Sequence, residues 1–298
     1  MPAGATPLRV DRTWIGAPAG TLGNPTAWLL VATLVLLAIG SGGYLTGALP
    51  AWAAVAVNAV GIYVGFTPLH EAMHGVAHER RALNGTIGRL AGIPLTVTLP
   101  LFRGVHHEHH SHTNDPARDP DLIVARRPRW LLPLWFLGIM VEYRTKFYGH
   151  RLWRTRGQLV EAIAMDIVLL GVVVTAARGG WLTPLLVLWL GPAALAVLFL
   201  AFAFDFLPHY PYDSDARYLD TRAYPGAALN AVLLGQNYHL IHHLWTTIPW
   251  YRYRRVFAAT ESALRARGCR IGWTVTPLPG GASGPGSRTG SPAPSMTA

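Results

Sequence analysis

Four long apolar runs dominate the chain and set the first expectation about its fold. They lie between polar and basic segments. A helix needs about 20 residues to cross a bilayer, and each run is long enough. The runs cover residues 27–49, 51–69, 159–177 and 181–207. A tight turn at Pro50 joins the first two, and residues 178–180 join the last two. The pattern predicts four transmembrane helices arranged as two antiparallel hairpins.

Two shorter apolar stretches, 87–102 and 130–141, are marginal or short for a span. The first of them also carries Gly92, Pro94 and Pro100. If residues 87–102 crossed the bilayer alone, the histidines before and after them would lie on opposite sides and could not share a site. We therefore expect both stretches to be interfacial or re-entrant.

Basic residues near the span ends predict the orientation. The two outer turns hold only Arg178, whereas the remaining segments hold most of the positive charge. These segments include Arg80, Arg81, Arg89, Arg103, Arg126, Arg127, Arg129, Arg144, Lys146, Arg151, Arg154 and Arg156. The positive-inside rule places both termini and the middle segment in the cytoplasm, and we expect a multi-pass protein of the cell inner membrane.

Composition agrees with a membrane protein, because 51% of the residues are hydrophobic and only 13% are charged. The net charge is +10, but the arginines lie beside apolar runs, so the charge follows membrane topology and does not indicate nucleic-acid binding. The first apolar run is too long for a signal peptide, so we expect an uncleaved span. The expected organisation is a cytoplasmic segment at 1–26, a membrane domain at 27–275 and a disordered tail at 276–298.

Three histidine clusters carry the candidate chemistry. Within each cluster the later histidines lie three or four residues after the first, so their rings share one face of a helix. The clusters are His70 and His74, then His106, His109 and His110, then His239, His242 and His243. Asp205 and His209, again four residues apart, lie where the fourth span should leave the membrane. His78 is one further step of four beyond His74 and is expected near the same face.

A bound metal is the natural partner for so many packed imidazoles, which are costly to bury unpaired. The parity of the four spans places every cluster on one face of the membrane. Nine imidazoles are too many for one ion and suit two. Cys269 is the single cysteine, so a Cys-rich zinc site or an iron–sulfur cluster is excluded. Nitrogen ligands alone leave Fe, Zn, Cu and Ni open.

One alternative arises from the first cluster. The segment from His70 to His74 reads H-E-x-x-H, the zinc-protease motif in which Glu71 would be the general base. That interpretation leaves the other two clusters unexplained, so an intramembrane zinc metalloprotease is a distant alternative.

The order and context of the clusters resemble the membrane fatty-acid desaturase and hydroxylase superfamily over roughly residues 27–257. The shared pattern is H-x-x-x-H, H-x-x-H-H and H-x-x-H-H, with two spans between the second and third boxes. The flanking residues at 106–121, 205–209 and 236–251 look most like the β-carotene hydroxylase branch, and GQNYHLIHHLW is the most specific stretch. Carotenoid ketolases are similar with a different context around boxes two and three, and acyl-lipid desaturases share the boxes more loosely.

The resemblance implies an all-α fold of four transmembrane helices with a cytoplasmic helical cap that carries a di-iron site. It implies two iron ions held by His70, His74, His106, His109, His110, His209, His239, His242 and His243. Asp205 matches a position where related desaturases place an asparagine that reaches the metal through water, so it is a candidate ligand of metal or water. His78 and His112 recur in the carotenoid branch and are expected to support the ligands or to replace one.

The implied reaction is O₂-dependent hydroxylation of a lipophilic substrate, in the first place the ring of a carotenoid. A fatty acyl desaturase or hydroxylase is the alternative. The chain has no flavin or nicotinamide fingerprint and no cysteine set for a cluster, so an external electron donor such as ferredoxin must dock. The basic surface would attract an acidic carrier and, equally, anionic lipid.

Several other side chains near the boxes have two interpretations each. Carboxylates expected to hold the imidazole N–H groups are Glu71, Glu108, Asp115, Asp119 and Asp121. The segment 114–121 also reads as a turn with Asx hydrogen bonds. Asp166 inside the third span is either functional or hydrogen-bonded in the interior. The aromatic residues Trp245, Trp250, Tyr251 and Tyr253 would line a substrate tunnel or form an interfacial belt.

Overall fold

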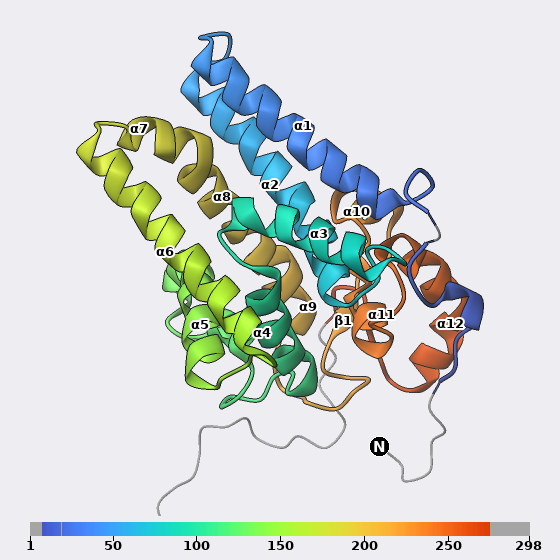
Figure 1. Cartoon of the computed structure of the whole chain (residues 1–298). Coiled ribbons are helices and arrows are strands. Elements are labelled where there is room, and N and C mark those ends of the chain that lie inside the picture. Colours follow the sequence, from blue (N-terminus) through green and yellow to red (C-terminus); the bar gives the residue numbers. More distant parts are fainter. Residues whose placement is uncertain (1–7, 19, 275–298) are drawn as a thin grey trace, which may run out of the picture.

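The computed structural model describes residues 8–18 and 20–274, and this part of the chain is mostly helical. Two long helical hairpins project to one side, and shorter helices form a cap at the other end (Figure 1). Four helices are long and apolar enough to cross a membrane: α1 (Pro25–Leu45), α2 (Ala51–Met73), α6 (Arg156–Arg178) and the composite helix Leu182–His209. They coincide with the four predicted runs to within a few residues at each end, so the expectation of four apolar spans is confirmed.

Side-chain hydrogen bonds and a close helix crossing fix the first hairpin. Asn24 caps the start of α1, and its amide also donates to the carbonyl of Ala77 at 2.7 Å, just after α2. At Gly40 the two helices approach so closely that a Cβ would lie 2.2 Å from Oδ1 of Asn58. The Asn58 amide donates to the carbonyl of Leu188 at 3.1 Å. Because that carbonyl belongs to the fourth span, the bond connects the two hairpins inside the apolar region.

Two π-helical turns interrupt the fourth span. Its segments are α7 (Leu182–Leu185), η5 (Leu186–Leu190), α8 (Gly191–Leu200), η6 (Ala201–Phe206) and α9 (Leu207–His209). Pro192 and Pro208 lie just after the two wide turns, and proline has no N–H to give to the turn before it. Wider hydrogen-bonding turns of this kind often mark functional positions. The second one carries Asp205 and leads to His209 at the cap.

The predicted interfacial stretch 87–102 turns a corner. It belongs to α3 (Arg81–Gly92), η2 (Ile93–Leu95) and α4 (Leu99–Ser111), and the two longer helices are bent by 90°. Gly92 is required at the bend, because a Cβ there would lie 2.3 Å from the carbonyl oxygen of Val97. Thr96 has a left-handed backbone, with φ 58°, which helps to reverse the chain. The corner turns α4 toward the cap with its histidines.

The other short apolar stretch, 130–141, begins in η4 (Arg129–Leu131) and continues in α5 (Leu132–Gly149), and η3 (Pro120–Ala125) precedes both. Arg144 of α5 donates from Nε to Oδ1 of Asp166 on α6 at 2.8 Å. The hydroxyl of Tyr148 donates to the other oxygen of the same carboxylate at 2.7 Å. Of the two interpretations of Asp166, the structure therefore has the hydrogen-bonded one, and the residue ties α6 to α5.

The C-terminal part of the cap holds the third histidine cluster. Its elements are β1 (Arg222–Ala223), α10 (Ala227–Val232), η7 (Gln236–Tyr238), α11 (His239–Leu244), η8 (Trp250–Arg252), α12 (Tyr253–Ala266) and β2 (Arg270–Ile271). β1 pairs in parallel with β2. Ile241 and Leu244 of α11 pack with Val256 and Leu264 of α12 in a separate apolar core. The N-terminal η1 (Arg12–Trp14) joins this unit, because Arg252 donates to the carbonyl of Trp14 at 2.9 Å.

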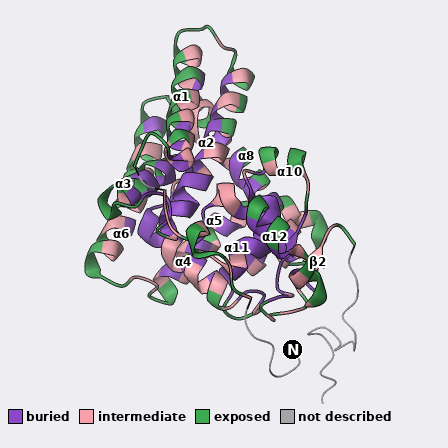
Figure 2. Cartoon of the chain, turned by 90° about the vertical axis from the view of Figure 1, so that its right-hand side faces the viewer, coloured by how far each residue is buried: buried purple, intermediate pink, exposed green. Residues whose placement is uncertain are grey.

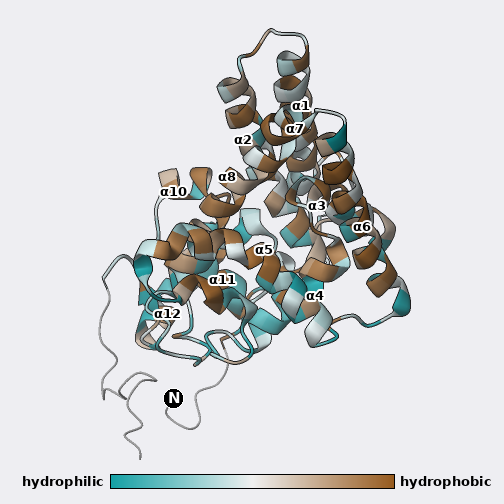
Figure 3. Cartoon of the chain, turned by 90° about the vertical axis from the view of Figure 1, so that its left-hand side faces the viewer, coloured by the Kyte–Doolittle hydropathy of each residue, from teal (hydrophilic) through white to brown (hydrophobic). Residues whose placement is uncertain are grey.

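Burial and hydropathy distinguish the two ends of the molecule. Figure 2 shows the buried residues gathered toward the cap, while the far ends of α1 and α2 are largely exposed. Figure 3 shows that the long helices are apolar and that hydrophilic residues concentrate around the cap. Exposed large apolar side chains, such as Val35 on α1 and Ile167 on α6, cover the long helices. A surface that is both exposed and apolar suits contact with lipid. The tail at 276–298, for which the sequence predicts disorder, lies outside the described residues.

Candidate metal centre

Three helices from distant parts of the chain bring the first histidine group together. His70 lies in the last turn of α2, and His74 is the residue that caps the end of this helix. With His106 of α4 and His242 of α11 they form a group of four candidate ligands whose ring nitrogens lie within 4.8 Å of one another. His70 is 36 residues from His106 and 172 from His242, so the packing of α2, α4 and α11 creates the site.

The second histidine group uses the neighbouring turns of the same helices. His109 of α4, His209 at the end of α9, and His239 and His243 of α11 have ring nitrogens within 4.8 Å of one another. Nε2 of His209 lies 3.2 Å from Nε2 of His239, and Nε2 of His109 lies 3.3 Å from Nε2 of His243. α4 and α11 thus each contribute histidines to both groups.

His110 lies between the two groups. Its Nε2 is 3.0 Å from Nε2 of His106 and 2.9 Å from Nε2 of His242, while its ring centroid is 4.3 Å from that of His243. Together with the two groups of four, His110 completes the set of nine that the sequence placed in one site. The structure therefore brings all nine together.

The separations between ring nitrogens fit bound metal. Ligand nitrogens about 2.1 Å from one ion lie about 3 Å apart when the angle at the ion is near 90°. Within the two groups and His110, the Nε2 atoms in contact are 2.9 to 3.3 Å apart. Hydrogen bonds between the rings cannot pair all of these nitrogens, because each neutral ring has only one N–H donor. A cation bound at the centre of each group satisfies them all.

Burial keeps most of these rings in the form that binds metal. It lowers the pKa values of His106, His242 and His243 well below the usual value, and neighbouring histidines act in the same direction. A neutral imidazole keeps a lone pair on one nitrogen, which is the pair that a metal needs. The rings are thus ready to coordinate at neutral pH without losing a proton.

His109 is held differently, by two buried carboxylates. Burial lowers its pKa, but Asp119 and Asp121 outweigh burial and raise the pKa to about 10. Oδ1 of Asp119 lies 2.8 Å from Nδ1 of His109, and Oδ2 of Asp121 lies 3.3 Å from it. The backbone N–H of Asn114 donates to Asp119 at 2.7 Å and fixes its orientation. The carboxylates therefore hold the proton on Nδ1, and a metal bound at Nε2 would displace the second proton of this ring.

The segment 114–121 fulfils both of its sequence interpretations, through different residues. Asp119 and Asp121 contact His109, whereas Asp115 forms an Asx turn. Its Oδ1 accepts the N–H of Ala117 at 2.8 Å and that of Arg118 at 3.2 Å. Asp115 therefore shapes the loop that carries the two carboxylates.

Tyr253 supports the first histidine group, a role that its sequence context did not predict. Its hydroxyl lies 2.9 Å from Nδ1 of His242, and its side chain is fully buried at the start of α12. Tyr253 is thus part of neither a tunnel nor an interfacial belt. Trp250 likewise hydrogen bonds inward, through its indole N–H to Oγ1 of Thr26 at 3.2 Å. Tyr253 lies eleven residues after His242, a spacing that matches no helix or strand repeat. The sequence alone therefore could not pair them.

Glu71 lies close to His70 but is bound to the chain's own backbone. Its Oε1 is 3.8 Å from Nδ1 of His70, which is too long for a hydrogen bond. Its Oε2 accepts the backbone N–H of Trp250 at 3.2 Å. The carboxylate is fully buried and connects the end of α2 to η8.

Three other predicted site residues, His78, Glu108 and His112, lie apart from the two groups. His78 was expected on the helical face of His74, but α2 ends at Met73 and the chain reverses at Gly75, with φ 77°. His78 therefore contacts Thr21, with Nε2 3.2 Å from its Oγ1.

Glu108 pairs with residues outside the two histidine groups. Its carboxylate lies 2.7 Å from Arg118 and 3.4 Å from His112. His107 of the same box lies outside both groups, and its ring centroid is 6.1 Å from that of His74.

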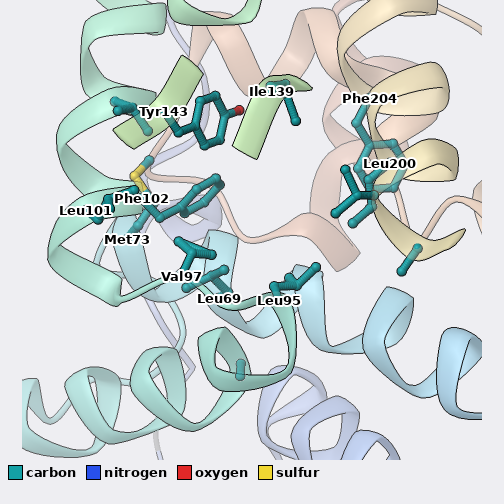
Figure 4. Close-up of a cluster of buried hydrophobic side chains, with 14 of the residues drawn as sticks. Leu69, Met73, Leu95, Val97, Leu101, Phe102, Ile139, Tyr143, Leu200 and Phe204 are labelled. Atoms are coloured by element: carbon teal, nitrogen blue, oxygen red, sulfur yellow. The ribbon is translucent and has the colours of Figure 1, made fainter. Parts of the chain in front are cut away.

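An apolar cavity ends at the histidines. It has a volume of about 50 Å³, and its walls are supplied by α2, η2, α4, α5, α8, η6, η7 and α11. Figure 4 shows the apolar side chains that meet there, including Leu69, Leu95, Phe102, Leu200 and Phe204. The polar atoms of the lining come from His70, His106, Tyr143, Asp205, Gln236 and His239. The cavity thus combines an apolar body with polar groups at the metal-binding end, as expected of a site for a lipophilic molecule.

Asp205 is placed at this boundary between substrate space and the histidines. It lies in the wall of the cavity with members of both histidine groups. The expectation that Asp205 is a ligand of metal or water stays a prediction.

Known proteins with similar sequences point in the same direction. The model of the family described as "Fatty acid desaturase" matches residues 46–274. The chain is 26% identical over 217 residues to a zeaxanthin 4-ketolase of Chlamydomonas reinhardtii, which covers 70% of this chain and 44% of the ketolase. It is 26% identical over 202 residues to a beta-carotene ketolase of Haematococcus lacustris, covering 64% and 57% of the two chains. It is 22% identical over 223 residues to an sn-1 oleoyl-lipid 12-desaturase of Anabaena variabilis, covering 64% and 63%.

The chain spans between 44% and 63% of the length of these relatives. They are two ketolases and a desaturase by name, so the hydroxylase branch expected from the residues flanking the boxes stays a prediction. The matched region contains all nine histidines, Asp205 and both carboxylates that contact His109. The resemblance seen in the histidine boxes is therefore confirmed at the level of the family: this chain belongs to the fatty acid desaturase family of di-iron membrane enzymes.

Proposed function

We propose that this chain is an O₂-dependent di-iron oxygenase of the membrane that hydroxylates the ring of a carotenoid. The observation that supports this function is the position of the two histidine groups at the end of an apolar cavity. Residues of the second and fourth spans form part of its wall, so the cavity begins in the apolar region, where a substrate dissolved in lipid is found. The names of two relatives indicate carotenoid chemistry, and the context of the boxes favours hydroxylation within that class.

In this proposal each histidine group binds one iron ion. One ion is held by His70, His74, His106, His110 and His242, and the other by His109, His209, His239 and His243. Asp205 is the candidate for a further ligand or for the residue that orients a water beside the ions. Imidazole and carboxylate are both suitable ligands for iron.

The chain itself contributes binding, orientation and exclusion of water. When bound, the iron pair supplies activation of O₂ and removal of hydrogen from an unactivated C–H bond. Phe102, Leu200 and Phe204 surround the apolar part of the substrate, and burying its surface provides the binding free energy. Asp119 and Tyr253 hold His109 and His242 at their Nδ1 atoms, so both rings keep one orientation. A fixed substrate in front of fixed ligands is what selects one C–H bond among many.

A fatty acyl desaturase or hydroxylase is the second candidate. It is favoured by the similarity to an acyl-lipid desaturase and by the same apolar cavity. A zinc protease is disfavoured by Glu71, whose carboxylate is fully buried and accepts the N–H of Trp250. A general base in that motif must reach a water molecule at the metal.

We further propose that the cap and both termini face the cytoplasm at the cell inner membrane, because the basic residues cluster at the cap end. Arg103, Arg151 and Arg154 line a surface groove together with His107, next to the first histidine group. An acidic electron carrier such as ferredoxin is the expected partner of this groove. Anionic lipid headgroups carry the same charge, and a carrier that reduces the protein equally well at high salt would argue against electrostatic docking.

The test is product analysis in cells that accumulate β-carotene and also express the chain with a ferredoxin system. Products with one and two added hydroxyl groups are the expected result. If the products are ring ketones, the carotenoid substrate is correct but the reaction is ketone formation and not hydroxylation. Unchanged carotene with newly unsaturated or hydroxylated acyl chains would support the second candidate. Purified protein should contain two iron ions per chain, and zinc without any oxidised lipid would contradict the oxygenase.

A further inference from the structure

Gln236 is a buried polar side chain in the wall of the apolar cavity, and the proposed chemistry does not use it. It is 1% exposed and lies beside His239 in the lining. Neither Oε1 nor Nε2 of its amide has a hydrogen-bond partner among the described residues. An unpaired buried amide lowers the stability of a fold, so such a group in an otherwise apolar wall indicates a ligand that satisfies it.

The backbone around Gln236 is fixed by tight packing. Gly235 has φ 83°, and a Cβ on it would lie 2.6 Å from the carbonyl oxygen of Trp250. The N–H of Gln236 donates to the carbonyl of Leu233 at 2.9 Å. The carbonyl of Asn237 accepts the N–H of Tyr224 at 2.7 Å. The side chain therefore extends from a rigid base, as a group that positions a ligand should.

The histidines of the lining face other histidines through Nε2. Nε2 of His70 lies 3.1 Å from that of His106, and Nε2 of His239 lies 3.2 Å from that of His209. An amide can donate one hydrogen bond and accept another, which matches a hydroxyl or a carbonyl oxygen. A carboxylate is a poor match, because its charge would be buried in a lining that contains no lysine or arginine. The chemistry of Gln236 thus selects a neutral oxygen on the ligand.

We propose that Gln236 hydrogen bonds an oxygen carried by the ring of the substrate, so that the enzyme prefers a ring that is already oxygenated to an unsubstituted one. This inference rests on the proposed function, because it assumes a ring-bearing lipid in the cavity. Gln236 is then a positioning residue that fixes which face of the ring meets the histidines. A hydrocarbon ring forms no hydrogen bond with the amide and leaves it buried without a partner. Both effects weaken the binding of such a ring.

The experiment compares two carotenoids that differ in ring hydroxyl groups only, β-carotene and zeaxanthin. Purified iron-loaded protein is titrated with each, and binding is followed by quenching of tryptophan fluorescence. The wild-type protein should bind zeaxanthin about tenfold more tightly, as expected for one buried hydrogen bond. Gln236→Met keeps the length of the side chain without its amide and should bring the ratio close to one. Gln236→Glu retains hydrogen-bonding oxygens and should keep a preference. Leu200→Met, an apolar change in the same lining, should alter both affinities alike.

Equal affinities in the wild-type protein would overturn the inference, and so would an undiminished preference in a Gln236→Met protein with normal iron content. If Gln236→Met does not fold, the wild-type ratio and the Gln236→Glu variant still decide. Turnover with a donor system separates this inference from the proposed function. A tenfold binding preference without oxidation of either carotenoid would refute ring oxidation while leaving the role of Gln236 intact. Oxidation of both carotenoids with equal KM would refute the role of Gln236 alone.

Discussion

The hydroxyl of Tyr253 lies 2.9 Å from Nδ1 of His242, and both side chains are fully buried. Through this contact the first turn of α12 fixes a ring of the first histidine group. With Nδ1 engaged, Nε2 of His242 lies 2.9 Å from Nε2 of His110 and 3.1 Å from that of His70. Asp119 does the same for His109 in the second group, at 2.8 Å. Each group thus has a partner outside it that sets the direction of one ligand.

Tyr253→Phe removes the hydroxyl and leaves the ring in place. We expect about a tenfold loss of iron affinity, because partners of metal-bound histidines typically contribute that much. The measurement is iron retained per chain during competition with a chelator. Tyr251→Phe is the matched control, since the buried hydroxyl of Tyr251 has no hydrogen-bond partner among the described residues. Equal iron loss in the two variants would contradict the role of Tyr253.

His242→Ala should abolish turnover while the chain still inserts into the membrane. The ring contacts His70 and His110, so its loss opens the first histidine group. His107→Ala should retain most activity, because His107 lies outside both groups. Product formation and membrane-fraction yield are measured together for both variants. Normal turnover in His242→Ala would refute the ligand assignment, and complete loss in His107→Ala would contradict the orientation of α4.

Asp119→Asn should release iron from the second group before the first. The change removes the charge that holds the proton on Nδ1 of His109, and we expect at least about a tenfold weaker second site. Iron content should fall from two ions toward one per chain at limiting iron. Asp115→Asn, in the same loop but hydrogen-bonded only to backbone N–H groups, is the control and should keep both ions. Loss of both ions together in Asp119→Asn would show that the loop, and not His109, had been affected.

Asp166→Asn should lower stability without changing iron content. The carboxylate binds Arg144 and Tyr148 in a partly buried position, and we expect a loss of about 1–2 kcal/mol. Glu161→Gln is the control, because its partner Arg89 is 53% exposed and such pairs contribute less than about 1 kcal/mol. Thermal unfolding in detergent compares the two variants. A loss of iron or activity at unchanged stability would restore the functional interpretation of Asp166.

Local patterns were sufficient for the spans and for the histidines. A run of apolar residues predicts a membrane helix whatever its neighbours are, and ring positions three and four apart share a helix face. The same reasoning was wrong for His78, because it continued α2 past His74. Gly75, with φ 77°, follows the end of the helix and changes the direction of the chain, so that His78 contacts Thr21. The spacing of His70, His74 and His78 is helical, but the backbone at Gly75 is not.

The sequence alone determined the four apolar helices, the nine histidines and the family, because each depends on residues that are close in the chain or on their order. Only the tertiary structure decided how the histidines divide. α4 gives His106 to one group and His109 to the other, and α11 divides His242 and His239 in the same way. It also decided that Tyr253 holds a ligand and that Gln236 faces the cavity. These contacts join segments whose distance depends on the packing of α2, α4, α11 and α12, and a one-dimensional pattern does not contain that packing.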